Sequence, residues 1–229
     1  LSADADNHIL KAAYALATRV KPLRVGKFHL VKSLPLASGM GGGSADAAAA
    51  LRLLAKLNSL SLDDKRVREA AQETGADVLV CLESGSRIMR GIGDALDKPL
   101  ILPPLFALVV NPLKTSATPE VFAKIGLARG EKNNAHPHPL FKTEMSTTDF
   151  LSALAQGRND MEAAAIALQP VIGDVFTSVA SLPSCRLTRM SGSGATVFGL
   201  FPSCRAAAAA ARRLKHTHPE WWIKPTLFR

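Results

Sequence analysis

The chain has 229 residues and a formal net charge of +9 at pH 7. Apolar residues make up 47% and charged residues 21%, an ordinary globular composition that excludes disorder along the whole length. No run approaches the ~18 apolar residues that a membrane span needs. Cys81, Cys185 and Cys204 are too far apart for a zinc or disulfide framework. We therefore expect a reduced, cytoplasmic setting and no membrane partner.

The basic surplus, 28 Lys and Arg against 19 Asp and Glu, is scattered along the chain. Its tightest cluster is only Arg212-Arg213-Leu214-Lys215. Aromatic residues make up 5%, so a base-stacking platform for nucleic acid has little support. We expect no nucleic-acid partner, because solvated helix faces and a phosphate-rich substrate account for the charge.

The first half of the chain predicts alternating helices and short strands. Asp4 or Asp6 can cap a first helix, and Gly75 can close a later one. The turn Gly91-Ile92-Gly93-Asp94 follows the last of these elements. In chain order we expect a helix over 3–19, a strand over 25–33, helices over 45–57 and 62–74, and strands over 77–82 and 86–90.

Pro99, Pro103 and Pro104 mark the expected joint between two domains, 1–102 and 103–229. Helices and strands alternate in both halves, which predicts an α/β or α+β class. After the joint we expect a strand over 105–110, a helix over 118–125, a polar loop over 129–146, helices over 147–156 and 159–181, strands over 185–190 and 195–201, a helix over 203–215 and an edge strand over 221–227.

The residues with a candidate chemical role lie in a glycine loop. This loop joins the strand expected over 25–33 to the helix expected over 45–57. Four glycines leave its backbone bare, so N–H groups there and at the following helix N-terminus can converge on a phosphate. Ser44 can donate its hydroxyl to phosphate or bind Mg²⁺. A Walker A loop is excluded because no lysine follows Gly43, and a dinucleotide fingerprint is excluded because serine stands where its third glycine belongs. A simple turn would not need four glycines, whose ordering costs entropy.

This loop resembles the phosphate-binding motif P-x-x-x-G-L-G-S/G-S/G-S-A/S of the GHMP small-molecule kinases. Further segments agree, namely Gly75-Ala76-Asp77-Val78, Asn159-Asp160-Met161-Glu162 and Ser191-Gly192-Ser193-Gly194-Ala195, so the resemblance covers nearly all of 6–202. The expected ATP-binding residues are Asn7, Pro35, Leu36, Ala37, Ser38, Gly39, Met40, Gly41, Gly42, Gly43, Ser44 and Ala45.

The resemblance implies an α+β, two-domain fold. Its N-terminal domain would be ribosomal protein S5 domain 2-like and ATP-binding, and its C-terminal domain ferredoxin-like. It also implies an ATP-dependent kinase with an alcohol acceptor, in which Mg²⁺ bridges the phosphates and Ser44 is the metal ligand. Asp77 would be the catalytic base; from chemistry alone, a capping or turn aspartate is an equal alternative.

The remaining roles also come from the resemblance. Phe122 matches an aromatic residue that stacks on a cytosine ring, with a core helix residue as the rival interpretation. Asn7 would lie near the adenine or cap a helix. Gly192, Ser193 and Gly194 would pack against the phosphate loop and the substrate, or form a simple hairpin turn. His136 and His138 flank Pro137 without a third metal ligand, which favours a solvated loop.

Lys32-Ser33-Leu34-Pro35 and the triple glycine most resemble the branch that acts on a cytidine diphosphate-linked methylerythritol. That branch phosphorylates its 2-hydroxyl in non-mevalonate isoprenoid biosynthesis. A homoserine-type or mevalonate-type kinase and a catalytically inactive ATP-binding fragment stay open, as do a monomer and a homodimer. The chain begins with Leu1, and the family's first lysine motif and Asp-Gly-Tyr-His segment are not found in it, so we expect N-terminal strands to be missing.

Overall fold

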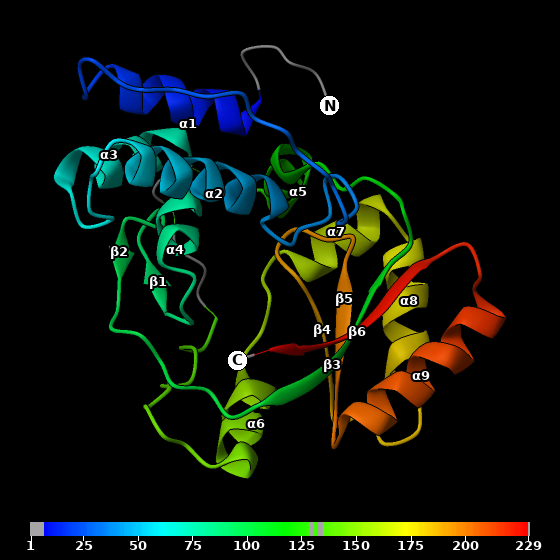
Figure 1. The fold of residues 1–229 in the computed structure, drawn as a ribbon. Coiled ribbons are helices and arrows are strands. Elements are labelled where there is room, and N and C mark those ends of the chain that lie inside the picture. The colour runs from blue at the N-terminus through cyan, green and yellow to red at the C-terminus, as the bar shows by residue number, and fades with distance from the viewer. Residues whose placement is uncertain (1–6, 129–130, 132–134, 229) are drawn as a thin grey trace. The chain divides into compact units, whose positions relative to one another are not determined.

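The structure is a computed structural model that describes residues 7–128, 131 and 135–228 (Figure 1). The chain divides into two compact units. The first holds the residues up to Lys32 and Gly41–Leu100, and the second holds Ser33–Met40 and the chain from Ile101 onward. The glycine loop is thus divided between the units. Its residues up to Met40 belong to the second unit, and those from Gly41 onward belong to the first. The assignment of whole domains to 1–102 and 103–229 stays a prediction.

The first unit is built on helices whose apolar faces share one core. Alanine and leucine recur at helical spacing in the helix after the glycine loop, where Ala47, Ala48, Leu51 and Leu54 are buried. Small alanines let neighbouring helices approach closely. The elements are α1 (His8–Ala17), α2 (Gly42–Leu57), α3 (Lys65–Thr74), α4 (Val78–Glu83), β1 (Met89–Arg90) and β2 (Ala95–Leu96).

Two predictions in this unit are wrong. Residues 25–33 form no strand; Val25 and Val31 are exposed, and no strand in the described part of the chain pairs with this segment to take up its backbone hydrogen bonds. Residues 77–82 contain most of helix α4, because a short apolar run does not distinguish a strand from a buried helix.

The helix predicted over 3–19 is α1, and the part before Asn7 lies outside the described residues. Asn7 caps it, in place of the predicted Asp4 or Asp6, since its side-chain oxygen accepts a hydrogen bond of 2.9 Å from the Ile9 N–H. The predicted turn at 91–94 joins β1 to β2, which are much shorter than the strand expected over 86–90.

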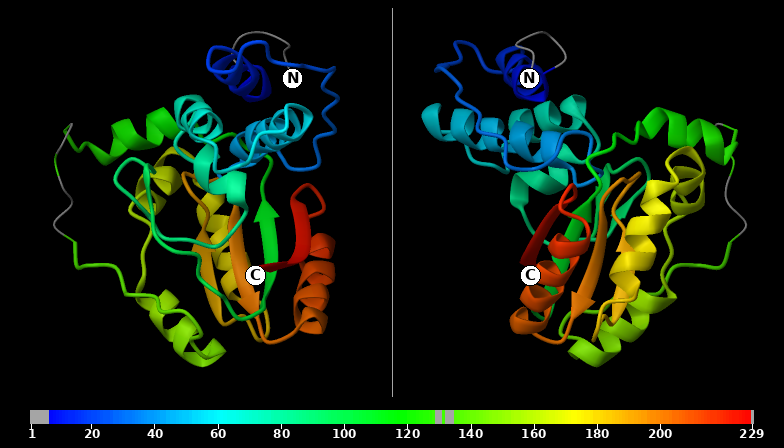
Figure 2. Two further views of the ribbon diagram at one scale, coloured as in Figure 1. Left: turned by 60° about the vertical axis from the view of Figure 1, so that its left-hand side comes forward. Right: turned by 90° about the vertical axis from the view of Figure 1, so that its right-hand side faces the viewer.

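The second unit is a four-stranded antiparallel sheet with helices on both faces (Figure 2). The strand order is β4-β5-β3-β6, with β6 at an edge as predicted. The strands are β3 (Leu105–Asn111), β4 (Leu187–Met190), β5 (Val197–Phe201) and β6 (Trp222–Phe228); the helices are α5 (Thr118–Ile125), α6 (Thr147–Gln156), α7 (Glu162–Leu168), α8 (Val171–Ala180) and α9 (Cys204–Thr217).

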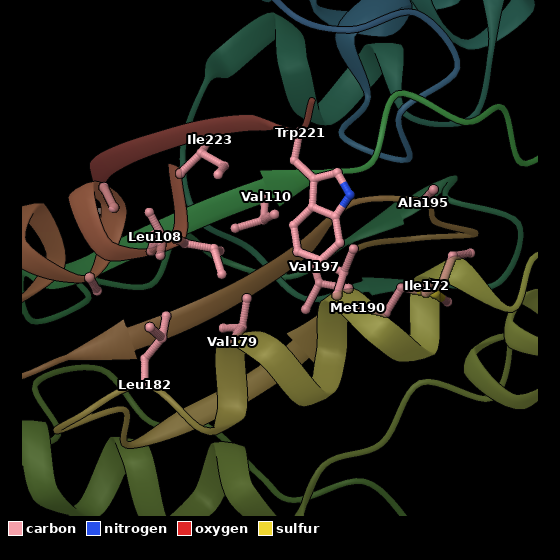
Figure 3. Packing of buried hydrophobic residues seen from close by; sticks show 14 of the residues in the cluster. Leu108, Val110, Ile172, Val179, Leu182, Met190, Ala195, Val197, Trp221 and Ile223 are labelled. Carbon is pink, nitrogen blue, oxygen red and sulfur yellow. The ribbon is translucent and has the colours of Figure 1, made fainter. Parts of the chain in front are cut away.

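The two faces of the sheet follow from the period of two along β3. Leu108 and Val110 lie in the core formed with α8 and α9 (Figure 3). Leu105 and Ala107 point to the other face, where Phe150 of α6 packs against them. Trp221 belongs to the same core, and Figure 3 shows its indole beside Val197 of β5 and Met190 of β4.

The helix predicted over 159–181 is wrong as one element, because α7 ends at Leu168 and α8 begins at Val171. Pro170 has no N–H to continue the ladder and clashes with the preceding turn, so the helix breaks there. The mixed helix and sheet composition confirms the predicted α+β class. Within the described residues, no helix has the length and apolar character needed to cross a membrane.

Candidate functional site

The first half of the glycine loop packs directly on the turn Ser191–Gly194 within the second unit. A Cβ on Gly39 would lie only 2.5 Å from the carbonyl oxygens of Ser191 and Gly194, and the φ of Gly39 is +71°. The Ser191 hydroxyl donates a hydrogen bond of 2.9 Å to the Gly39 carbonyl. Only glycine fits this contact between two backbones.

The same turn is tied to the strand-to-helix connection that leads into α5. The Ser116 hydroxyl donates to the Ser193 carbonyl at 2.7 Å, and the hydroxyls of Thr118 and Ser193 share a hydrogen bond of 2.7 Å. A Cβ on Gly194 would lie 3.1 Å from the Met190 sulfur. The Ser193 hydroxyl is therefore engaged by Thr118, and the turn is fixed by both hydrogen bonds and packing.

The second half of the loop begins α2 in the first unit. Gly41 is the N-cap in the left-handed conformation, with φ +65°, and no side chain caps this end. The first N–H groups of an α-helix have no intrahelical partner, so those of Gly42, Gly43 and Ser44 are available to an anion at the positive end of the helix dipole. Ser44 is the third helical residue, and its half-buried hydroxyl belongs to this same first turn.

One residue beside this helix, His8, was not predicted from the sequence as a site residue. His8 lies next to Gly43, whose Cβ position is 3.8 Å from the imidazole ring, so α1 brings Asn7 and His8 to the start of α2. Asn7 itself is engaged as the cap of α1. No sequence motif distinguishes His8, and its place depends on how α1 packs against α2.

An ion pair joins the segment before the glycine loop to the helix after it. Lys32 precedes the loop and Asp46 lies on α2, and the Lys32 ammonium bonds the Asp46 carboxylate. Their side chains are only 19% and 24% exposed, so water weakens this pair less than it weakens a surface pair. Lys32 belongs to the segment that resembles the family, but its pairing with Asp46 was not predicted.

Asp77 immediately precedes α4 and is exposed. Its side chain makes no capping hydrogen bond to the helix, so of the two structural alternatives the capping role is not observed, while the residue does lie in the turn that follows Gly75. One turn later, burial raises the pKa of the Cys81 thiol, and the negative charge of Asp77 adds to this shift. The carboxylate is an exposed acceptor at the start of a short helix.

The opposite end of α4 is held by arginines from three parts of the first unit. Arg52 of α2 donates to the Cys81 carbonyl at 2.7 Å and to the Leu82 carbonyl at 3.3 Å. Glu83 accepts from Arg68 of α3 at 2.8 Å and pairs with Arg87. These contacts bind α4 to α2 and α3, and no sequence motif predicts them.

Phe122 lies on the surface of α5, with 59% of the residue exposed, whereas its neighbour Val121 is buried. The rival interpretation of Phe122 as a core residue therefore does not hold. The ring lines a pocket of about 610 Å³ within the second unit. The pocket is also lined by Ile125, Leu127, His138, Arg158, Asn159, Asp160, Met161, Met190 and Gly192.

His138 reaches this pocket, but a metal centre does not form there. In the parts of the chain that the structure describes, no group of three or more His, Cys, Asp or Glu side chains could hold a metal ion. His136 contacts the Gln156 carbonyl at the limit of hydrogen-bond distance, 3.5 Å.

The glycine loop, the helix behind it and the sheet domain define the class of protein. Residues 7–85 match the family model of the GHMP kinases N terminal domain, and residues 147–220 match that of the GHMP kinases C terminal. The chain belongs to the GHMP kinases, which confirms the resemblance seen in its motifs.

Within this class the similar proteins carry one name. The chain is 52% identical over 224 residues to the 4-diphosphocytidyl-2-C-methyl-D-erythritol kinase of Methylobacterium radiotolerans, which covers 98% of this chain and 77% of that protein. It is also 52% identical over 229 residues to the protein of that name from Xanthobacter autotrophicus, covering 99% and 78%.

Solved structures agree. A crystal structure of 4-(cytidine 5'-diphospho)-2C-methyl-D-erythritol kinase matches with a TM-score of 0.73 and 29% identity, over 100% of this chain and 81% of that one. The homoserine kinase of Cytophaga hutchinsonii matches with a TM-score of 0.66 at 18% identity, over 100% and 81%, which shows a shared fold alone.

Proposed function

We propose that the chain catalyses ATP-dependent phosphorylation of the 2-hydroxyl of 4-diphosphocytidyl-2-C-methyl-D-erythritol in isoprenoid precursor biosynthesis. The observation that carries the proposal is the 52% identity, over nearly the whole chain, to kinases named for this substrate. The chain also has the glycine loop and the exposed aspartate that such a reaction needs. Its free thiols at Cys81, Cys185 and Cys204 suit the reducing cytoplasm, where we place the reaction.

The nucleotide would bind at residues 35–45 and at the start of α2. The uncapped N–H groups of Gly42, Gly43 and Ser44 would donate to phosphate oxygens, and Asn7 would lie near the adenine. The Ser44 hydroxyl offers the hard oxygen ligand that Mg²⁺ prefers. When bound, Mg²⁺ would neutralise phosphate charge, and the Lys32–Asp46 pair would hold the two ends of the loop in place.

Asp77 would act as the general base. Its carboxylate would accept the proton of the 2-hydroxyl while that oxygen bonds to the γ-phosphorus and the bond to the bridging β–γ oxygen breaks, releasing ADP. An exposed aspartate without a capping role suits this task, because its oxygens are not already committed to the helix. The arginine contacts at the far end of α4 would keep the carboxylate in position.

The acceptor would be recognised in the second unit, where its cytosine ring would stack on Phe122. We predict that Phe122→Ala raises the KM for the cytidine acceptor about tenfold, as expected for the loss of about 1–2 kcal/mol of aromatic stacking. The KM for ATP should stay near its original value, and Phe122→Tyr should retain most of the affinity. Leu140→Ala, which truncates a 79% exposed side chain outside this pocket, is the matched control.

A panel of acceptor alcohols tests the proposed reaction. Purified protein is mixed with Mg·ATP and 4-diphosphocytidyl-2-C-methyl-D-erythritol, homoserine or mevalonate, and ADP release is measured. We expect turnover only with the cytidine acceptor. Preferred turnover of homoserine or mevalonate would assign another activity within the family, and ATP binding without ADP release from any acceptor would indicate an inactive nucleotide-binding protein.

A further inference from the structure

Asn159 has every polar atom of its side chain engaged, and two of its three contacts hold the turn that packs on the glycine loop. Its amide nitrogen donates to the Gly192 carbonyl at 2.8 Å and to the Met190 carbonyl at 3.2 Å. Its amide oxygen accepts from the Met161 N–H at 3.0 Å, just before α7. The three partners fix the orientation of the amide, because two are acceptors and one is a donor.

The other side of the same turn contacts Gly39. The Ser191 hydroxyl donates to the Gly39 carbonyl, and a Cβ on Gly192 would lie 2.8 Å from that same oxygen. Gly192 is therefore held between Asn159 and Gly39. A change in the direction of its peptide groups would move the backbone against which the first half of the phosphate loop packs.

We propose that Asn159 is a positioning residue for the phosphate loop. By fixing the carbonyl groups of Met190 and Gly192, it sets the place of the turn and, through the turn, the place of Gly39. The proposal rests on the proposed role of residues 35–45 in nucleotide binding. Asn159 acts through Gly192 and has no role in the proton transfer assigned to Asp77.

The contacts of the turn explain why an asparagine is needed here. Ser116 and Thr118 hold Ser193, the next residue along, and make no contact with Met190 or Gly192 in their hydrogen bonds. Aspartate could still accept from Met161 but has no N–H groups for the two carbonyls. Serine offers a single donor. Asparagine supplies one acceptor and two donors from one planar group.

The variant Asn159→Asp separates positioning from helix capping. It keeps an oxygen for the Met161 N–H, while it removes both donors and brings a negative charge toward two carbonyl oxygens. We expect the Kd for Mg·ATP, measured by isothermal titration calorimetry, to rise about tenfold, because two hydrogen bonds are lost. The KM for ATP should rise in parallel with the Kd.

A matched control comes from the same unit. Ser203 caps α9 by accepting from the Ala206 N–H and lies in another helix cap, so Ser203→Ala should lower the melting temperature without changing ATP affinity. If Asn159→Asp does not fold, Ser191→Ala carries the test. This variant removes the hydrogen bond from the turn to the Gly39 carbonyl, so it should also raise the Kd for Mg·ATP.

The outcomes distinguish this inference from the proposed function. If the unsubstituted protein binds Mg·ATP and folded Asn159→Asp binds it equally well, the positioning role is wrong. The same conclusion follows if Ser203→Ala weakens ATP binding as much as Asn159→Asp does. If the unsubstituted protein does not bind Mg·ATP, the proposed function of the loop fails, and this inference fails with it.

Discussion

The two regions to which we assign function are held in place by different interactions. In the first unit, α4 follows Asp77 and is fixed at its far end by charged groups, with Arg52 on its carbonyls and Arg68 and Arg87 on Glu83. In the second unit, the turn Ser191–Gly194 is fixed by neutral hydrogen bonds and by glycines packed against backbone and core. The strength of charged contacts depends on pH and salt, whereas a closely packed region is destabilised by added side-chain volume.

The difference also indicates what each region can tolerate. An exposed carboxylate such as Asp77 can be replaced by its amide without a steric cost, so its loss should affect chemistry alone. Gly39 has no room for even one carbon, and Gly194 combines a φ of +88° with close contacts to Met190 and Ile172, so their replacement should disturb the structure first. Substitutions can therefore separate a chemical role in one region from a geometric role in the other.

The largest expected effect is the loss of chemistry in the first region. Asp77→Asn should lower kcat by roughly 10²–10⁴-fold, because the amide cannot accept the hydroxyl proton. The Kd for ATP should be nearly unchanged, since Asp77 lies outside the glycine loop. Steady-state kinetics and calorimetry measure the two quantities, and normal turnover by this variant would remove Asp77 from the mechanism.

The next effect is geometric and falls in the second region. Gly39→Ala should lower ATP affinity strongly and destabilise the fold by on the order of 1–3 kcal/mol from the left-handed backbone alone, with overlap against Ser191 and Gly194 added. Thermal melting and calorimetry provide the measurements. Gly26→Ala is the control, because its Cβ would meet nothing within 4 Å. Equal behaviour of the two variants would contradict the account of the loop contact.

A smaller effect is expected where α2 supports α4. Arg52→Met keeps much of the side-chain length but removes the hydrogen bonds to the Cys81 and Leu82 carbonyls, which should cost about 1–2 kcal/mol. If α4 positions Asp77, kcat should fall severalfold while the Kd for ATP stays constant. Arg52→Lys should recover part of both losses. A change in melting temperature with unaltered kcat would limit Arg52 to a structural role.

The smallest effect concerns pH. The hydrogen bond from Arg68 is the largest cause that lowers the pKa of Glu83 below its ordinary value, and Arg87 adds to it. Because the folded pKa lies below the unfolded one, ionised Glu83 stabilises the fold above the ordinary pKa. This contribution is lost as the pH falls through the folded pKa. For a partly exposed pair it should be under about 1 kcal/mol.

This comparison is measured with two variants. The melting-temperature difference between the unsubstituted protein and Glu83→Gln should be full at pH 7, shrink as the solution is acidified below about pH 4, and decrease with added salt. The corresponding difference for Ser116→Ala should change little with either, because its bond to Ser193 is neutral. Identical pH profiles would show that the two regions do not differ as described.

The sequence predicted those features that depend on local residue patterns. The four glycines before an alanine-rich run predicted the loop and α2, and the short apolar run LFALVV predicted β3 as a buried strand. The run at 77–82 was misassigned because Val and Leu suit a strand as well as a buried helix. The helix predicted over 159–181 is two helices because Pro170 interrupts an otherwise continuous helical pattern.

The supporting contacts could not be predicted, since they join residues far apart in the chain. Ser191 and Gly39 are separated by 152 positions, and Asn159 and Gly192 by 33. No local pattern indicates that Arg52 caps α4 or that Lys32 pairs with Asp46. The motifs indicated which segments carry the chemistry, whereas the structure shows what holds each segment in place.

The central claim is phosphoryl transfer to one hydroxyl of one acceptor, and the structure of the product tests it most directly. Purified protein is incubated with Mg·ATP and 4-diphosphocytidyl-2-C-methyl-D-erythritol, and the product is analysed by ³¹P nuclear magnetic resonance. The account predicts a new phosphate monoester on the 2-hydroxyl, formed in equal amount to ADP. A phosphoryl group on another hydroxyl, or ADP released with inorganic phosphate and an unchanged acceptor, would contradict it.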